Sequence, residues 1–212
     1  MSERRTEVTP ELEQLLVPYW DNVDPLITRI QEDLHRREKY PMQISREQVA
    51  FHGWLVRLVG ARTVLEVGTY LGLSGAAFAQ AMGVDGHLDT VEVSDEHADI
   101  AEGWFREGGL ADRIHVHRGA ALEVVPRLLG PYDMCFLDGA KVDNPRLLEL
   151  CIERTRKNGL ILCDNTFRGG ELGTDDPDAT ATRLLLELAR NDPRVDPVVV
   201  PVADGILICR VV

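Results

Sequence analysis

Lysine, aromatic residues and positive charge are all scarce in this chain of 212 residues. Lysine and arginine together number 23 against 35 aspartate and glutamate residues, so the formal net charge is −12 at pH 7. A charge of this sign repels the phosphate backbone of nucleic acids and the headgroups of anionic lipids. We therefore expect no nucleic-acid partner and no membrane partner.

Long apolar runs and cysteine motifs are also missing. No apolar run approaches the roughly 20 residues that cross a bilayer, and the polar beginning MSERRTEVTPELEQ lacks the apolar core of a signal peptide. The four cysteines form no Cys-x-x-Cys pair, which disfavours a zinc or disulfide role. We expect a cytoplasmic protein, and the length is that of a single domain, residues 1–212.

Short apolar or β-branched runs alternate with helical patterns from residue 63 onward. The strand-like runs are TVLEVG, HLDTVEV, RIHVHR, MCFLD and LILCDN, and helical patterns lie near residues 74–82, 95–107, 120–129, 145–156 and 178–190. This alternation predicts a parallel sheet with helices on both faces. The last two runs, VDPVVVPV and GILICRVV, are linked only by ADG, so the final strand should be antiparallel.

The first 60 residues have the patterns of helices. The segment SREQVAFHGWLVRLVG is amphipathic, with Ser45 as a candidate N-cap, Glu47 and Gln48 near the capping-box position, and Gly60 as the stop. We expect residues 1–60 to form a helical segment. The α/β core that binds the cofactor should then span residues 61–212.

The first strand of this core breaks at a glycine-rich turn, the place where a doubly wound sheet binds a nucleotide-like cofactor. Gly68, Gly72 and Gly75 are spaced more widely than the dinucleotide-binding G-x-G-x-x-G, which weakens the alternative of an NAD-dependent oxidoreductase. Glu66 precedes the turn. Glu92, at the end of the second strand, can accept hydrogen bonds from the hydroxyls of a ribose. The expected ligand is an adenosine joined to a cationic group.

Two later strands end in oxygen-bearing side chains. MCFLD ends at Asp138, and LILCDN ends at Asp164 and Asn165. Neighbouring parallel strands lie about 4.8 Å apart, so the three side chains should converge. Hard oxygen donors of this kind fit Mg²⁺, or another hard divalent cation such as Mn²⁺ or Ca²⁺. The alternative is that both aspartates merely cap the segments that follow.

Lys141, one of three lysines in the chain, lies three residues beyond Asp138. A lysine beside a bound dication and partly out of water can act as a general base near neutral pH. Alternatively it is a surface lysine paired with Asp143. His115 and His117 share one face of the run RIHVHR, but the sequence offers no third ligand, so we expect no competing metal centre there.

Several of these segments together resemble the cation-dependent class I O-methyltransferases of the catechol and caffeoyl-CoA type, which use S-adenosylmethionine. The matching segments are LEVGTYLGLSG, TVEVSDEHADIAEGWFREGGLADRIHVHRGAALEVV, FLDGAK, GLILCDNTFRGG, NDPRVDPVVVPVADGILICR and the approach MQISREQVAFHGWLVRLVGARTVLEVGT. The resemblance runs from about Met42 to the C-terminus. It implies a Rossmann-like fold with a seven-stranded, mostly parallel sheet and an antiparallel last strand. It also suggests a homodimer, with residues 1–60 contributing to the acceptor site or to the dimer contact.

The resemblance also implies roles for individual residues. Metal ligation falls to Asp138, Asp164 and Asn165, and general-base catalysis to Lys141. The implied reaction is methyl transfer to a catechol-like acceptor whose two adjacent hydroxyls chelate the metal while Lys141 deprotonates the attacking one. A non-catalytic S-adenosylmethionine-binding protein is the remaining alternative. The implied cofactor contacts are Met42, Ile44, Glu66, Gly68, Thr69, Ser74, Glu92 (ribose), Ala121 (adenine) and Asp138.

Two positions depart from the family pattern. Ala140 stands where many members carry a second aspartate, and Arg168 stands near the place of a tryptophan that covers the substrate. A cationic group at Arg168 could face an acidic tail of the substrate.

Overall fold

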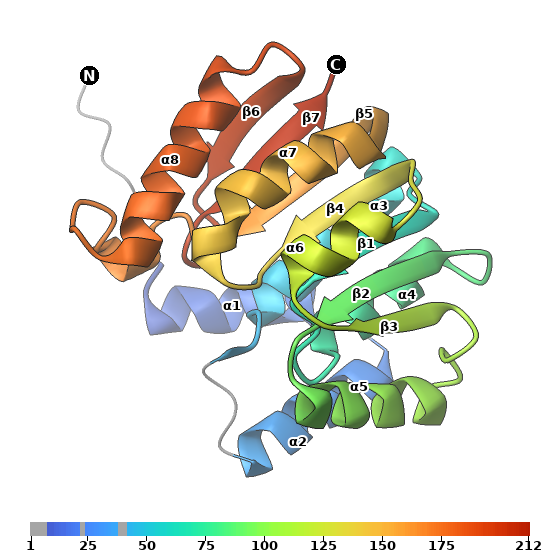
Figure 1. Cartoon of the computed structure of the whole chain (residues 1–212). Helices are drawn as coiled ribbons and strands as arrows, with labels where there is room; N and C mark the ends of the chain where they lie inside the picture. Colours follow the sequence, from blue (N-terminus) through green and yellow to red (C-terminus); the bar gives the residue numbers. More distant parts are fainter. Residues whose placement is uncertain (1–7, 22–23, 38–41) are drawn as a thin grey trace.

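The protein is built around one seven-stranded sheet (Figure 1). The computed structural model describes residues 8–21, 24–37 and 42–212. The strand order is β3-β2-β1-β4-β5-β7-β6, and all pairs from β3 to β5 are parallel. The strands are β1 (Thr63–Val67), β2 (His87–Glu92), β3 (Ile114–Arg118), β4 (Tyr132–Leu137), β5 (Thr155–Asp164), β6 (Val195–Val200) and β7 (Ile206–Val211).

The last strand runs against the rest of the sheet. β7 pairs antiparallel with both β5 and β6, as the short link before it predicted. The Rossmann-like fold expected from the sequence is thereby confirmed. One consequence matters for function: the carboxyl ends of β1, β2, β4 and β5 all meet at the same edge of the sheet.

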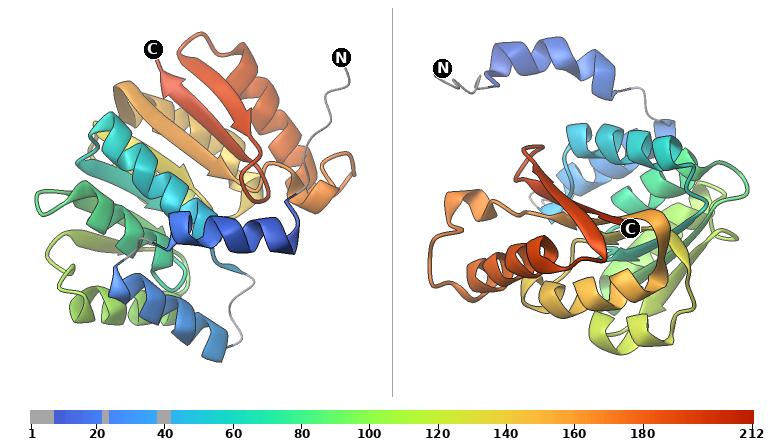
Figure 2. Two further views of the ribbon diagram at one scale, coloured as in Figure 1. Left: turned by 180° about the vertical axis from the view of Figure 1, so that it is seen from behind. Right: turned by 90° about the horizontal axis from the view of Figure 1, so that it is seen from above.

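Helices cover both faces of the sheet (Figure 2). Buried side chains from α2, α3, α4 and α5 pack on one face, and those from α7 and α8 pack on the other. The two apolar clusters fit strands buried on both sides. The core helices are α4 (Leu73–Met82), α5 (Asp95–Glu107), α6 (Ala121–Val124), α7 (Asn144–Arg154) and α8 (Pro177–Asn191).

The N-terminal region is helical, as expected: α1 (Pro10–Trp20), α2 (Pro25–Arg36) and α3 (Arg46–Val59). The capping box before α3 is present, because Ser45 Oγ accepts a bond from the Gln48 amide and the Gln48 side chain accepts one from the Ser45 amide. Gly60 ends the helix in the left-handed conformation, with φ of 63°. Among the described residues, no helix is long and apolar enough to cross a membrane.

Some element boundaries differ from the sequence expectation. The helix expected over 120–129 is only α6 followed by a 3-10 turn, Val125–Arg127, because Pro126 cannot donate to a continuing helix. The helix expected to reach residue 156 ends at Arg154, since Thr155 already pairs with Tyr132 of β4. Strand pairing therefore takes residues that helical periodicity alone assigned to the helix.

Candidate functional site

A cavity of about 520 Å³ lies at the carboxyl ends of β1, β2 and β4. Its walls come from the turn after β1, the end of β2, the start of α6 and the end of β4. Five of the residues expected to contact the cofactor line it: Met42, Gly68, Glu92, Ala121 and Asp138. The topology thus brings together side chains that are up to 96 residues apart in the sequence, from Met42 to Asp138.

The Glu92 carboxylate is held in place by the backbone around it. Oε2 accepts a hydrogen bond from the Tyr70 amide at 2.8 Å, and Oε1 accepts one from the Ser94 amide at 2.8 Å. Each oxygen keeps a further lone pair, since a carboxylate can accept about four bonds. A fixed acceptor at the end of β2 can therefore bind the hydroxyls of a ribose.

Glu66 belongs to a buried hydrogen-bonded group rather than to the cavity wall. Thr90 Oγ1 donates to Glu66 Oε2 at 2.6 Å, and the hydroxyls of Thr90 and Thr69 lie 2.5 Å apart. Burial raises the pKa of Glu66 to about 8, although hydrogen bonds from Ser74 and Thr90 oppose this shift. Glu66, Thr69 and Ser74 are thus brought together beneath the turn, and none of them lines the cavity.

Ile44 also lies away from the cavity. It is buried in the apolar cluster that includes residues of α2, α3 and α4. Met42, two residues earlier, is 67% exposed and lines the cavity. Of the two residues expected to close over the cofactor, the structure places only Met42 against the cavity.

A second cavity, of about 290 Å³, adjoins the first and shares Met42, Asp138, Gly139 and Ala140 with it. Asp138, Lys141, Asp164 and Asn165 all line this second cavity. β4 and β5 are neighbours with Leu137 paired to Cys163, so the side chains that follow them meet as expected. A group in the larger cavity and a molecule in the smaller one would therefore lie next to each other.

The two aspartates form a buried acidic pair that Lys141 compensates only in part. Burial raises the pKa of Asp164 to about 6, and the nearby Asp138 carboxylate raises it further. Burial also raises the pKa of Asp138, against the opposing effect of Lys141, whose Nζ donates to Asp138 Oδ1 at 2.8 Å. Lys141 is paired with Asp138, and no ion pair with Asp143 is present among the described residues.

The sequence reasoning missed Gln48 as a member of this site. Its Nε2 donates to both Asp164 carboxylate oxygens, each at 2.8 Å. Its Oε1 accepts the capping-box hydrogen bond from the Ser45 amide. One buried side chain therefore both caps the N-terminus of α3 and orients Asp164. The capping-box pattern predicted the first role, but nothing in the sequence indicated the second, which depends on where α3 lies against β5.

Arg168 lines the smaller cavity, as its position after Asn165 suggested. Its Nη2 lies 3.2 Å from Asp178 Oδ2 at the start of α8. The charge of Arg168 is therefore partly neutralised by Asp178, a partner that the sequence did not reveal.

The fold is that of class I methyltransferases. A family model described as O-methyltransferase matches residues 21–212. The chain therefore belongs to the O-methyltransferase family, and it is an S-adenosylmethionine-dependent O-methyltransferase acting on a small-molecule acceptor.

Individual relatives agree with this family. The catechol O-methyltransferase of Mycobacterium tuberculosis is 35% identical over 156 residues, which cover 72% of this chain and 71% of that protein. The O-methyltransferase of Bacillus cereus, solved in complex with SAH, superposes with a TM-score of 0.88 at 28% identity over 95% of this chain and 97% of that one. TomG of Streptomyces achromogenes, solved with SAM, gives a TM-score of 0.86 at 25% identity over 93% and 96%.

Proposed function

We propose that this enzyme is a divalent-metal-dependent O-methyltransferase whose acceptor is a catechol-like compound with two adjacent hydroxyls. The observation that carries the proposal is the smaller cavity, where Asp138, Asp164, Asn165 and Lys141 face one space beside the larger cavity. The relative named catechol O-methyltransferase supports the choice of acceptor.

The cofactor belongs in the larger cavity. Glu92 would bind the ribose hydroxyls, Ala121 would contact the adenine, and Met42 would cover the bound molecule. Gly68 keeps the cavity wall close to the end of β4, because its φ of 99° and the nearby Asp138 carbonyl leave no room for a side chain. A cationic group bound nearby would oppose the raised pKa of Glu66 and favour its charged form.

Asp138, Asp164 and Asn165 fit a hard divalent cation such as Mg²⁺, Mn²⁺ or Ca²⁺. All three donors are oxygens, and burial together with the nearby Asp138 carboxylate raises the pKa of Asp164, an effect that a bound cation would oppose. When bound, such an ion supplies Lewis-acid chemistry that makes a catechol hydroxyl more acidic. Gln48 keeps Asp164 in one orientation.

Lys141 is the proposed general base. Its Nζ, once neutral, takes the proton of one acceptor hydroxyl, and the resulting phenolate oxygen attacks the methyl carbon of the sulfonium. A new O–C bond forms while the S–C bond breaks, and S-adenosylhomocysteine leaves. The protein contributes mainly orientation, since the two cavities set the acceptor beside the cofactor. Arg168 and Asp178 border the acceptor side, where Arg168 could meet an acidic tail.

A metal-removal experiment tests the proposal. Wild-type enzyme is treated with excess chelator, and methyl transfer to catechols, hydroxycinnamates, their thioesters and flavonoids is assayed before and after Mg²⁺ is restored. We expect turnover to vanish in chelator and to return with Mg²⁺, and we expect only acceptors with adjacent hydroxyls to react. Undiminished activity in chelator would overturn the metal requirement, whereas equal activity on monophenols would overturn the acceptor class.

We also propose that the enzyme works as a homodimer with residues 1–60 at the acceptor site or at the contact. α1 buries none of its side chains, and it exposes Leu15 and Tyr19. Sedimentation of the full chain would give the mass of two chains. A cytoplasmic location is part of the same proposal, supported by four buried free cysteines of the kind found in reducing compartments.

A further inference from the structure

Three histidines and one aspartate cluster on β2 and β3, away from both cavities. His87 and Asp89 are two residues apart on β2, and His115 and His117 are two residues apart on β3, with Asp89 paired in register to His115. Side chains two residues apart share a face of a sheet, so all four project to the same side. His115 is exposed on this side, whereas His87, Asp89 and His117 are partly buried.

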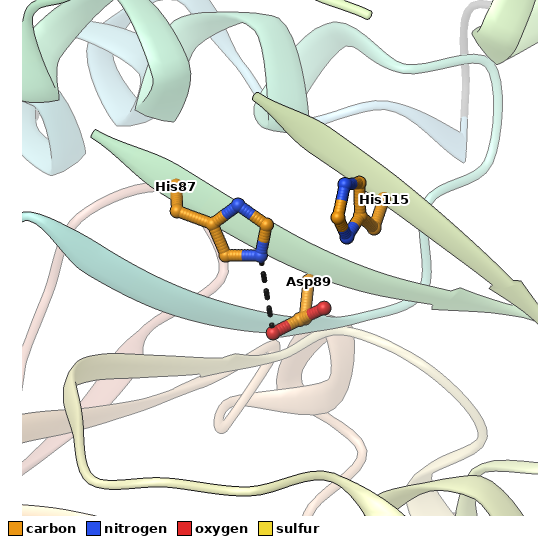
Figure 3. A group of neighbouring side chains, drawn as sticks. All are labelled: His87, Asp89 and His115. Carbon is orange, nitrogen blue, oxygen red and sulfur yellow. Dashed lines mark ion pairs between the residues drawn. The ribbon is translucent and has the colours of Figure 1, made fainter. Parts of the chain in front are cut away.

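The ligand atoms of His87, Asp89 and His115 all lie within 4.8 Å of one another. His87 Nε2 is 3.5 Å from Asp89 Oδ2, and the His87 and His115 rings meet edge to face with centroids 4.6 Å apart. Figure 3 shows the three side chains gathered from the two neighbouring strands. Ligands bound to one ion at about 2.0–2.1 Å cannot be more than about 4.2 Å apart, so the three ligand atoms must move slightly closer together when an ion binds.

Two further side chains hold the Asp89 carboxylate. His117 Nε2 lies 2.6 Å from Asp89 Oδ1, and the Tyr132 hydroxyl donates to Asp89 Oδ2 at 2.8 Å. Tyr132 reaches this carboxylate from β4, across β1. Outer partners of this kind orient the ligands of metal sites and strengthen binding. The aspartate is thus oriented before any ion arrives.

We propose that His87, Asp89 and His115 bind one Zn²⁺ ion, or a chemically similar first-row transition-metal ion. Two imidazoles and one carboxylate suit such an ion, whereas Mg²⁺ prefers oxygen ligands only. The site is separate from the proposed catalytic cation site, because His87 begins β2 and Glu92 at its other end lines the cofactor cavity, roughly 16 Å away at about 3.3 Å per residue.

The bound ion links the edge strand β3 to β2. Within the described part of the chain β3 pairs with β2 alone, so a metal bridge between His115 and the β2 ligands adds a connection at the edge of the sheet. An ion that binds the folded chain better than the unfolded chain stabilises the fold by mass action. The inferred role is therefore structural and does not depend on the proposed catalytic chemistry.

Zinc binding to the full chain, measured by calorimetry in millimolar Mg²⁺ that occupies hard-ion sites, tests the proposal. We expect one Zn²⁺ per chain and a thermal unfolding midpoint raised by about 5 °C. His115→Ala should weaken Zn²⁺ binding at least about tenfold and abolish the thermal shift, because it removes one of three ligands. His35→Ala, which removes an exposed histidine of α2, serves as the matched control and should behave as wild type.

A second measurement on the wild-type chain covers the case in which His115→Ala does not fold. Imidazole nitrogen resonances are recorded by NMR with and without Zn²⁺, and those of His87 and His115 should shift while those of His35 and the buried His52 should not. Equal Zn²⁺ affinity in wild type and a folded His115→Ala would overturn the site. So would an absence of Zn²⁺ binding, or shifts confined to His97 in the cofactor cavity.

Discussion

Lys141 is the side chain on which the proposed proton transfer depends. Arginine at this position keeps a cation beside Asp138 but cannot give up its proton near neutral pH. We expect Lys141→Arg to lower kcat by about 10²- to 10⁴-fold, the usual contribution of general acid–base catalysis. The measurement is turnover of a catechol at saturating Mg²⁺ and S-adenosylmethionine.

Lys157→Arg is the matched control for this change. Lys157 is exposed on β5, so the same replacement there should leave turnover and cofactor affinity unchanged. Calorimetric binding of the cofactor to Lys141→Arg should also stay close to wild type, since Lys141 does not line the larger cavity. Wild-type turnover in Lys141→Arg would show that another group removes the proton.

Gln48 should act as a positioning residue for the metal site. Gln48→Leu removes both hydrogen bonds to Asp164, so we expect the Mg²⁺ concentration for half-maximal activity to rise by about 10- to 100-fold. Ser45→Ala separates this effect from helix capping, because it breaks the same capping box without touching Asp164. It should cost about 1 kcal/mol of stability and leave the Mg²⁺ dependence unchanged. If Ser45→Ala raised the Mg²⁺ concentration for half-maximal activity by the same factor, the effect would come from the position of α3 and not from the hydrogen bonds of Gln48.

At the scale of elements, the turn between β1 and α4 forms part of the wall of the larger cavity. Gly68 has φ of 99°, and an added Cβ would lie 2.7 Å from the Asp138 carbonyl oxygen. Gly68→Ala should therefore push the ends of β1 and β4 apart. We expect the free energy of unfolding to fall by about 2–5 kcal/mol, the sum of a left-handed backbone penalty and a steric clash. We also expect weaker cofactor binding.

Gly60 provides the comparison for this turn. It also has positive φ, at 63°, but an added Cβ there meets nothing within 4 Å. Gly60→Ala should lower the free energy of unfolding by only about 1–2 kcal/mol, the backbone penalty alone. The variant should bind the cofactor as the wild type does. Urea denaturation and cofactor calorimetry on both variants check the difference. Equal losses in the two variants would mean that contact with β4 is unimportant.

At the scale of the whole molecule, buried His52 should make stability depend on pH. Its ring packs against Phe78 and Phe136, and neither ring nitrogen has a hydrogen-bond partner among the described residues. Burial lowers the pKa of His52 from 6.5 to about 3. Between these values the unfolded chain binds a proton that the folded chain does not, so stability falls as pH falls through this window.

His52→Phe should remove this part of the pH dependence. The free energy of unfolding of the wild type should fall relative to that of the variant by about 1.4 kcal/mol for each pH unit below about 6. Urea denaturation at several pH values between 4 and 7 measures this difference. His35→Gln is the control and should follow the wild type. Parallel curves for His52→Phe and wild type would show that His52 is protonated in the folded protein.

Much of the architecture follows from local patterns in the sequence. The alternation of strands and helices, the capping box at Ser45 and the short link before β7 each depend on neighbouring residues, so they predicted the elements and the antiparallel last strand correctly. The convergence of Asp138, Asp164 and Asn165 was also predictable, because parallel strands joined by one helix pair side by side. Helix ends near Pro126 and Thr155 were not, since strand pairing and proline chemistry overrode the apolar periodicity.

Local patterns in the chain are therefore enough to predict the family, the sheet, and the set of oxygen donors and lysine at its edge. Packing between distant elements determines which of these residues face a cavity: Met42 does, whereas Ile44 and Glu66 are buried. It also brought Gln48 to Asp164, Asp178 to Arg168, and His87 with Asp89 to His115. The physical reason is that such contacts join distant segments, and their geometry depends on how helices and strands pack rather than on any local spacing.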